Sequence, residues 1–183
     1  KLVSGVDVRQ RGPLGAQTDV SIRGGNYEQM TVLLNGINIG DPQTGHNAFD
    51  FPVDISEIER IEILEGPAAS VYGTSSLLGA INIVTKANRT SSVTLHAASG
   101  SFGSVTSGGR INVARGKWNN QLSGSFMRTD GYNRNKAGTL NTDFRSQKAF
   151  YQGFYNDEDL SMSWHAGLSN KDFGSSTNYS AKY

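Results

Sequence analysis

Hydrophobic and polar positions follow one pattern before residue 86 and another after it. Before it, short apolar runs such as residues 18–25 (TDVSIRGG) and 30–40 (MTVLLNGINIG) end in glycine, which is typical of strands closed by turns. Residues 79–86 (GAINIVTK) predict a further strand. Loops and short helical stretches separate these strands, so the pattern predicts a small α+β unit over residues 1–86.

The run from residue 54 to residue 65 changes its hydrophobic period. Ile55 and Ile58 share one face at helical spacing, and from Arg60 onward apolar and charged residues alternate as in a strand. Two N-cap residues have a glutamate three positions later, as a capping box requires: Asp54 with Glu57, and Ser56 with Glu59. The sequence therefore predicts a capped helical turn that leads directly into a strand.

The segment that follows Gly66 looks at first like a phosphate-binding loop. A P-loop needs a lysine directly after its second glycine, but Gly73 is followed by Thr74 and Ser75, and no G-x-G-x-x-G is present. Pro67 is instead suited to start a short helix that Gly73 ends. No nucleotide site is predicted, and the glycines are assigned to close packing.

After residue 86, apolar and polar residues alternate over five stretches joined by turns. One face of the last stretch is apolar throughout: Leu160, Met162, Trp164, Ala166 and Leu168. The opposite face of the stretches carries polar groups such as His96, Arg110 and Ser163. At roughly 9 to 11 residues each, the stretches are long enough to cross a bilayer at a tilt, which favours the wall of a barrel with a polar interior. A soluble antiparallel sheet with one wet face has the same alternation, so both interpretations stay open.

Composition excludes several classes of function. The 183 residues carry a net charge of +1 with both signs interspersed, so the bulk charge indicates neither a nucleic acid nor an anionic surface as a partner. The chain has no cysteine, which excludes disulfides, thiolate metal sites and cysteine nucleophiles.

Acidic and histidine side chains give weak evidence for a catalytic or metal site. Four carboxylates alternate with apolar residues across the helix-to-strand junction, and most are expected to face water: Glu57, Glu59, Glu62 and Glu65. The three histidines form no pair at ligand spacing: His46, His96 and His165. We therefore predict no catalytic residues, no cofactor and no metal.

A long polar loop between residues 130 and 143 is the remaining candidate for an ion site. It is rich in oxygen ligands that calcium prefers: Asp130, Asn133, Asn135, Asn141 and Asp143. Their spacing matches no EF-hand, and polar loops commonly have this composition. An ordinary loop is the preferred interpretation, with calcium as the alternative.

Two long segments resemble the plug domain of TonB-dependent outer-membrane receptors. They are VSGVDVRQRG…TDVSIRGGNYEQMTVLLNGINIGDP and IERIEILEGPAASVYGTSSLLGAINIVTK. The family's sequence runs I-R-G, V-L-x-D/N-G, I-E-R-I-E-x-x-x-G-P, S/A-x-Y-G and G-x-I-N-I-x-T occur in order over almost all of the first 86 residues. The resemblance implies a plug over residues 1–86, truncated at its N-terminus, and the first part of a barrel over 87–183. The intact family has a barrel of about 22 strands, and about five are expected here.

The resemblance also implies roles for particular residues. Charges on strands that pack on both faces would hold the plug to the barrel wall: Arg23, Arg60 and Glu62. Two plug apices would face the substrate: Asn26, Tyr27, Glu28 and Gln29 in the first, and Asp41, Gln43, Thr44, His46, Asn47, Phe49 and Phe51 in the second. An ordinary polar loop is an equally weighted interpretation of the second apex.

The implied function is active uptake of a scarce nutrient across the outer membrane. The segment MTVLLNGINIGDPQTGH places cobalamin ahead of a ferric siderophore as the substrate. The implied partners are TonB, through an N-terminal box that this chain lacks, a small-molecule ligand and a surface lipoprotein, but no nucleic acid. The alternative is a soluble β-rich ligand-binding or surface-adhesion module.

Overall fold

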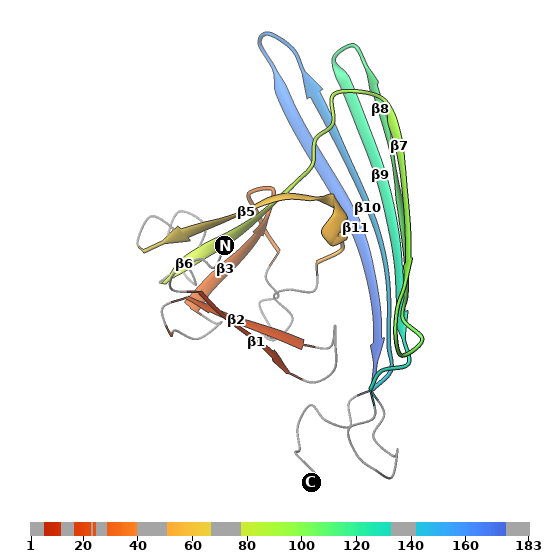
Figure 1. Cartoon of the computed structure of the whole chain (residues 1–183). Helices are drawn as coiled ribbons and strands as arrows, with labels where there is room; N and C mark the ends of the chain where they lie inside the picture. The colour runs from red at the N-terminus through yellow and green to blue at the C-terminus, as the bar shows by residue number, and fades with distance from the viewer. Residues whose placement is uncertain are drawn as a thin grey trace. The chain divides into compact units, whose positions relative to one another are not determined.

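The computed structural model describes residues 6–11, 17–22, 24, 29–39, 51–66, 78–132 and 142–174, which form two compact units (Figure 1). The first unit contains the described residues up to Phe51 and continues with Ile58–Lys86. The second contains Pro52–Glu57 and the described residues from Ala87 onward. Among the described residues, the chain therefore enters the second unit twice.

The first unit consists of a hairpin and a four-stranded sheet. Strands β1 (Val6–Arg11) and β2 (Gln17–Ile22) pair antiparallel in the hairpin. The sheet has the order β4-β3-β6-β5, with bounds β3 (Met30–Leu34), β4 (Ile37–Asn38), β5 (Ile58–Glu65) and β6 (Gly79–Thr85). Strands β3 and β6 run parallel, whereas β5 runs antiparallel to β6. The strands predicted at residues 18–25 and 79–86 are thus confirmed by β2 and β6. The single strand predicted over residues 30–40 is wrong, because a turn at Asn35 and Gly36, both with positive φ, divides it into the antiparallel strands β3 and β4.

The centre of this sheet forms the core of the first unit. All five residues of β3 are buried, as expected of a central strand that packs on both faces. Leu33 and Ala80 are packed together with Leu64. A Cβ atom at Gly79 would collide with the backbone oxygen of Leu64, so glycine is required where β5 and β6 approach each other. Close packing therefore explains this glycine.

A short 3₁₀ helix, η3 (Ile55–Glu57), stands where the sequence predicts a capped helical turn. Asp54 caps it as predicted, because its Oδ1 accepts a hydrogen bond from the backbone N–H of Ser56 at 2.9 Å. The carboxylate of Glu57 does not complete a capping box and points to another part of the chain. The helix predicted after Pro67 lies outside the described residues. Among the described residues, no helix is long and apolar enough to cross a membrane.

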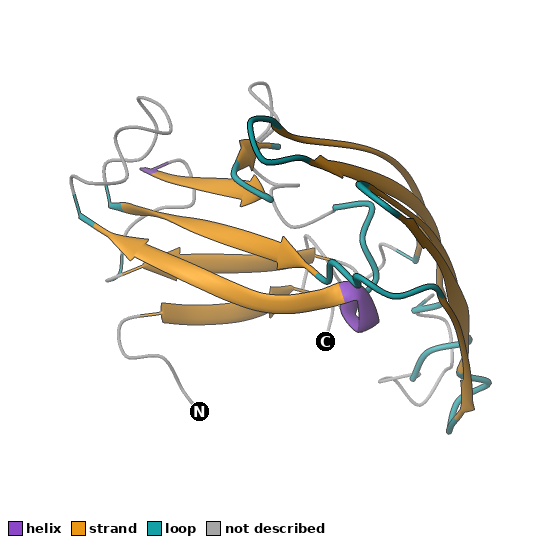
Figure 2. Cartoon of the chain, turned by 90° about the horizontal axis from the view of Figure 1, so that it is seen from above, coloured by secondary structure: helices purple, strands orange, loops and turns teal. Residues whose placement is uncertain are grey.

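The second unit is an antiparallel sheet of five strands that pair in chain order. Their bounds are β7 (Ser92–Ser99), β8 (Val105–Arg115), β9 (Trp118–Thr129), β10 (Phe144–Asn156) and β11 (Ser161–Phe173). The five predicted strands are confirmed, and the last three are longer than predicted because pairing continues through their polar ends. The sheet is curved (Figure 2).

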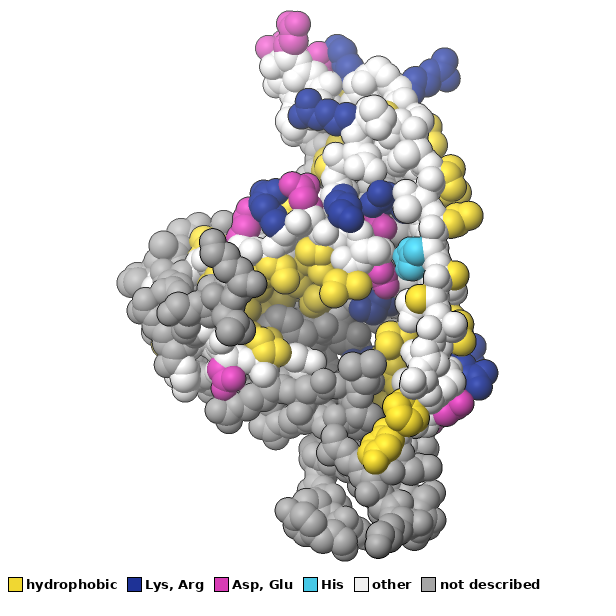
Figure 3. All heavy atoms as spheres, viewed as in Figure 1, with side chains coloured by type: hydrophobic (Ala, Val, Ile, Leu, Met, Phe, Trp, Pro, Cys, Tyr) yellow, Lys and Arg dark blue, Asp and Glu magenta, His cyan; other side chains and the backbone are white. Residues whose placement is uncertain are grey.

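The two faces of this sheet have inverted polarity. We call the face that Pro52–Glu57 contacts the docked face and the opposite one the apolar face. On the docked face, Gln121 and Gln152 are only 1% exposed, whereas Leu95 and Leu168 on the apolar face are 81% and 77% exposed. Figure 3 shows apolar side chains standing out along the sheet. Burial of amides and exposure of leucines are expected of a barrel wall that faces lipid.

Charges on the apolar face are confined to its two ends. Arg115 lies at one end, beside Trp118 in the strand register, and Arg128 and Arg145 lie opposite each other at the other end. Within these described strands, no charged side chain lies on the apolar face between the two ends. From residue 118 to residue 128 the chain spans roughly 34 Å at about 3.4 Å per residue. At a tilt of about 40° this gives a height of about 26 Å, which matches the apolar band of membrane barrels.

Candidate functional site

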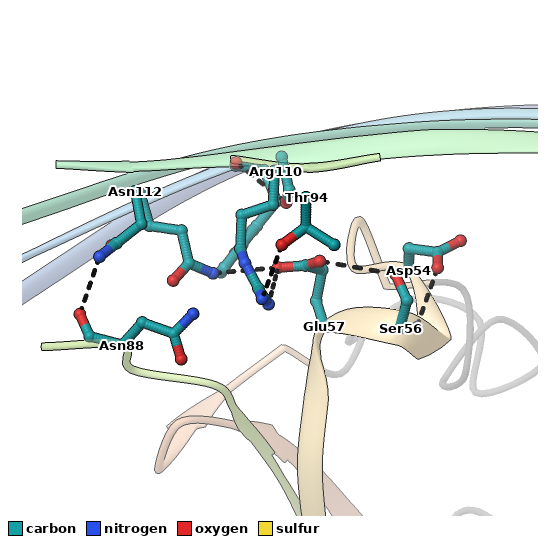
Figure 4. Close-up of polar contacts among 10 residues, drawn as sticks. Asp54, Ser56, Glu57, Asn88, Thr94, Arg110 and Asn112 are labelled. Carbon is teal, nitrogen blue, oxygen red and sulfur yellow. Dashed lines mark hydrogen bonds and ion pairs between the residues drawn. The ribbon is translucent and has the colours of Figure 1, made fainter. Parts of the chain in front are cut away.

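The segment Pro52–Glu57 interacts with each of the five strands of its own unit, and we call these six residues the anchor segment. Its polar side chains are Asp54, Ser56 and Glu57, and its apolar residues are Pro52, Val53 and Ile55. Figure 4 shows the polar part of the contact, with η3 lying against the docked face of the sheet.

Glu57 forms the centre of this contact. Its side chain is buried, with only 4% of the residue exposed. Its Oε2 accepts one hydrogen bond from Nη1 of Arg110 at 3.2 Å and another from Nε2 of Gln121 at 3.0 Å (Figure 4). Arg110 is 9% exposed and also donates to the hydroxyl of Thr94 at 3.5 Å. A buried ion pair of this kind holds two segments in one arrangement, because separating them would leave a charge unpaired away from water.

Asp54 adds a second polar contact next to Glu57. Burial raises the pKa of the Asp54 carboxyl, but hydrogen bonds from Ser56 and Ser125 together with the nearby His96 outweigh this effect and hold the pKa below its ordinary value. The carboxyl is therefore ionised at neutral pH. Ser125 lies on β9 and His96 on β7, so Asp54 extends the contact to both strands.

Apolar packing completes the attachment. Val53 is fully buried, and its carbonyl oxygen accepts a hydrogen bond from Nζ of Lys148 at 3.2 Å. A Cβ atom added to Gly167 would lie 2.6 Å from Cβ of Pro52 and 3.0 Å from the ring of Phe150. Pro52 thus packs directly on the backbone of β11, where only glycine leaves room for it.

We expect Gly167→Ala to lower the free energy of unfolding by about 1–3 kcal/mol, the usual cost of overpacking. Gly124→Ala is the matched control, because a Cβ there meets its nearest neighbour at an ordinary 3.7 Å in the same sheet. Urea unfolding of both variants of the full-length protein measures the difference. Equal midpoints for the two variants would show that Pro52 does not pack against β11.

The chain that leads into β7 contacts the same face. Asn112 is buried and donates hydrogen bonds to the backbone oxygens of Asn88 and Thr90 at 3.0 and 2.6 Å. Asn119 also donates to the oxygen of Asn88. Both described segments that lead into the second unit are therefore held by buried polar side chains of the docked face.

The residues predicted to hold a plug to a wall are arranged differently. Arg60 donates to Glu62 at 2.8 Å and to Glu59 at 2.9 Å, and it is exposed on the edge strand β5. A hydrogen bond from Asn82 and the charge of Arg60 lower the pKa of the Glu62 carboxyl. Within the described residues these two charges are not buried, since the side chains of Arg60 and Glu62 are 54% and 39% exposed. Their contact with a barrel wall stays a prediction, and Arg23 lies outside the described residues.

Most of the predicted substrate-facing residues lie outside the described part of the chain. Gln29 is exposed directly before β3, and Phe51 is half-buried directly before the anchor segment. The remaining apex residues are not described, so the two apices stay predictions. Residues 133–141 of the polar loop are likewise outside the described ranges. Among the residues that are described, no group of three His, Cys, Asp or Glu side chains is placed to hold a metal ion.

Glu57 is the important residue that the sequence pattern does not identify. The sequence predicts that most carboxylates near it face water, and for Glu57 this is wrong. The available signal was Arg110, a lone charge in the middle of a predicted strand, which implies a buried carboxylate partner. Nothing in the pattern indicates which carboxylate that is.

Comparison with known proteins agrees with the two-part fold. Residues 1–80 match the family model of the TonB-dependent receptor plug domain. A vitamin B12 transporter, BtuB, from Vibrio vulnificus (strain CMCP6) is 31% identical over 183 residues, which cover 95% of this chain and 30% of the relative. The chain thus spans less than a third of the length of that relative.

Two solved structures have the same fold. The copper transporter OprC has a TM-score of 0.70 at 17% identity and covers 93% of this chain, which corresponds to 27% of OprC. The ferric yersiniabactin uptake receptor FyuA from Yersinia pestis has a TM-score of 0.68 at 19% identity, over 93% of this chain and 28% of FyuA. The match to the plug model agrees with the fold. It also agrees with a sheet that is polar on its docked face and carries, on the other face, an apolar band about as high as a bilayer. This chain belongs to the TonB-dependent receptors.

Proposed function

We propose that the full-length protein is a receptor and transporter that takes up a scarce small-molecule nutrient, with the plug gating the barrel. The family places the chain in the cell outer membrane and is one of receptors and transporters, not of enzymes. The observation that carries the proposal is the plug sequence joined to a sheet with an apolar outer band and a polar inner face. A gated pore needs both parts, and a catalytic role requires neither.

TonB is the proposed source of energy. In the mechanism implied by the family, TonB pulls on an N-terminal box and rearranges the plug, and the box is expected outside this chain. A surface lipoprotein is a further proposed partner.

Cobalamin is the proposed substrate, ahead of a ferric siderophore. The support is the sequence identity to proteins named vitamin B12 transporters, which reaches 34% over 126 residues in Vibrio cholerae. The structural neighbours include siderophore and copper receptors, but at their low identity they support the fold and not a ligand. The two apices would supply the ligand contacts.

The test of this proposal is ligand binding and uptake by the full-length receptor. Cobalamin should quench its tryptophan fluorescence in a saturable way, and a panel of ferric siderophores should not. His46→Ala and Asn47→Ala in the second apex should weaken the quenching, whereas Thr90→Ala, outside both apices, should not. Saturable quenching by a siderophore alone would reassign the substrate. Recovery of the protein in a soluble fraction would favour the alternative, a soluble binding or adhesion module.

The anchor segment adds a proposed detail of the gate: it stays on the wall when the rest of the plug moves. Its six residues are held by a buried ion pair, a capped turn and close packing on β11. Ile58, directly after it, already belongs to the other compact unit. Movement would therefore begin at the junction between Glu57 and Ile58.

Cross-linking tests whether the anchor segment stays in place. Asp54→Cys combined with Ser125→Cys replaces a side-chain hydrogen bond by a disulfide, and the oxidised receptor should take up substrate as well as the reduced one. Uptake lost on oxidation and restored by a reductant would contradict a fixed anchor, but it would still support the proposed transport function. Each single-cysteine variant serves as the control for oxidation elsewhere.

A further inference from the structure

Aromatic side chains gather on the apolar face at the end of the sheet that has the short turns. Trp118 lies with its ring centroid 4.7 Å from that of Tyr155 and 6.1 Å from that of Trp164. The polar ends of two of these rings have partners, because the hydroxyl of Tyr155 donates to Asp157 at 3.1 Å and Nε1 of Trp164 donates to the hydroxyl of Tyr151 at 3.4 Å. Tyrosine and tryptophan in this arrangement mark the boundary between hydrocarbon and headgroups, and short turns mark the periplasmic end of a membrane barrel.

A shallow cavity of about 520 Å³ opens beside this aromatic cluster. Its walls combine apolar, aromatic and cationic groups: Val113, Arg115, Lys117, Trp118, Asn120 and Tyr155. The cavity is continuous with the apolar band, because Val113 and Trp118 belong to both. Any ligand that fills it would have its apolar part next to lipid tails and its polar part next to two cations.

The charges around the cavity are ordered along the strands. Lys117 is already neutralised by an ion pair with Asp157, whereas Arg115 has no hydrogen-bond or ion-pair partner among the described residues. The register places Arg115 level with Trp118 and Tyr155. Glu158 and Asp159 lie in the turn three and four residues beyond Tyr155, farther from the apolar band. A cation therefore borders the band, and two anions lie outside it.

We propose that this cavity, which we call the rim site, binds the headgroup of a zwitterionic phospholipid with a phosphate and a terminal ammonium. Arg115 would bind the phosphate, Trp118 and Tyr155 would pack on the glycerol region, and Glu158 and Asp159 would attract the ammonium. The order of the charges matches such a headgroup, in which the phosphate lies next to the tails and the amine lies outermost. A headgroup with only negative charge would meet repulsion from the acidic turn. The proposal depends on the membrane location of the family but not on the nutrient that is transported.

Native mass spectrometry of the purified full-length receptor tests the rim site. Receptor titrated with phosphatidylethanolamine should retain one lipid more firmly than receptor titrated with phosphatidylglycerol. Arg115→Gln should reduce the retention of phosphatidylethanolamine several-fold. Arg128→Gln is the matched control, since it removes an arginine from the opposite end of the same face and should leave retention unchanged.

Three results would overturn the rim site. Equal retention by the Arg115→Gln and Arg128→Gln variants would show that Arg115 binds no headgroup. Tighter retention of phosphatidylglycerol would contradict the role of Glu158 and Asp159. Displacement of the lipid by millimolar inorganic phosphate would identify the site as one for free phosphate. In a second variant, Glu158→Gln combined with Asp159→Asn should shift the preference toward phosphatidylglycerol, while cobalamin binding should stay unchanged in every variant.

Discussion

Glu57→Gln should lower the free energy of unfolding of the full-length receptor by about 3–5 kcal/mol, the usual cost of breaking a buried ion pair on one side. The substitution keeps the size of the side chain but removes its charge. Arg110, which is 9% exposed, would then be left as a buried cation without a carboxylate. The shift of the urea midpoint measures the effect.

Glu59→Gln is the matched control for this prediction. It is the same substitution two residues away, and Glu59 forms an ion pair with Arg60 in which both side chains are about half exposed. Exposed pairs contribute about 0–1 kcal/mol. Similar losses for the two variants would show that Glu57 is not held in a buried pair.

A double-mutant cycle separates the ion pair from general packing. Arg110→Met removes the cation and keeps much of the side-chain length, so Glu57→Gln should cost far less in that background. The coupling arises because a neutral pair leaves no buried charge unpaired. Additive losses would contradict a direct interaction between the two residues.

Leu122→Arg should destabilise the protein in a lipid bilayer by about 2–4 kcal/mol, because it places a charge near the middle of the apolar band. Leu122 is 55% exposed on the apolar face, between Trp118 and Arg128 along β9. Its direct neighbours on that face are Ile111 and Tyr151, and neither carries a carboxylate that could form an ion pair with the new arginine. Reversible unfolding from lipid vesicles is the appropriate measurement.

Val113→Arg controls for depth in the bilayer. Val113 is 53% exposed on the same face but lies only two residues from Arg115, so an arginine there can reach the headgroups. The expected loss of stability is therefore about 0–1 kcal/mol. A loss that depends on depth supports a sheet in contact with lipid. Equal and small losses at both positions would favour a sheet whose apolar face is in contact with water or protein.

The sequence predicts the strands of both units because alternation is a local signal. Each of the five stretches after residue 86 has its own period of two. Met162, Trp164, Ala166 and Leu168 lie on the apolar face, as their spacing requires. The plug motifs are equally local, since each one is a short run. Their described glycines either adopt a positive φ, as Gly24, Gly36 and Gly66 do, or allow a close approach, as Gly79 does. Such features need no knowledge of distant partners.

The partners across the molecule were decided by the tertiary structure. Alternation places Arg110 on the polar face, but the choice among four nearby carboxylates depends on how the chain turns before β5. Glu57 lies in the three-residue helix η3 and not in β5, where Arg60 and Glu62 alternate with Ile61 and Ile63, and 53 residues separate Glu57 from Arg110. In the same way, a period of two does not show that β5 is an edge strand or that Arg60 and Glu62 pair with each other. The sequence thus determined which face of each strand is polar, and only the folded chain decided which polar groups meet, because an ion pair depends on distance in space and not on spacing along the chain.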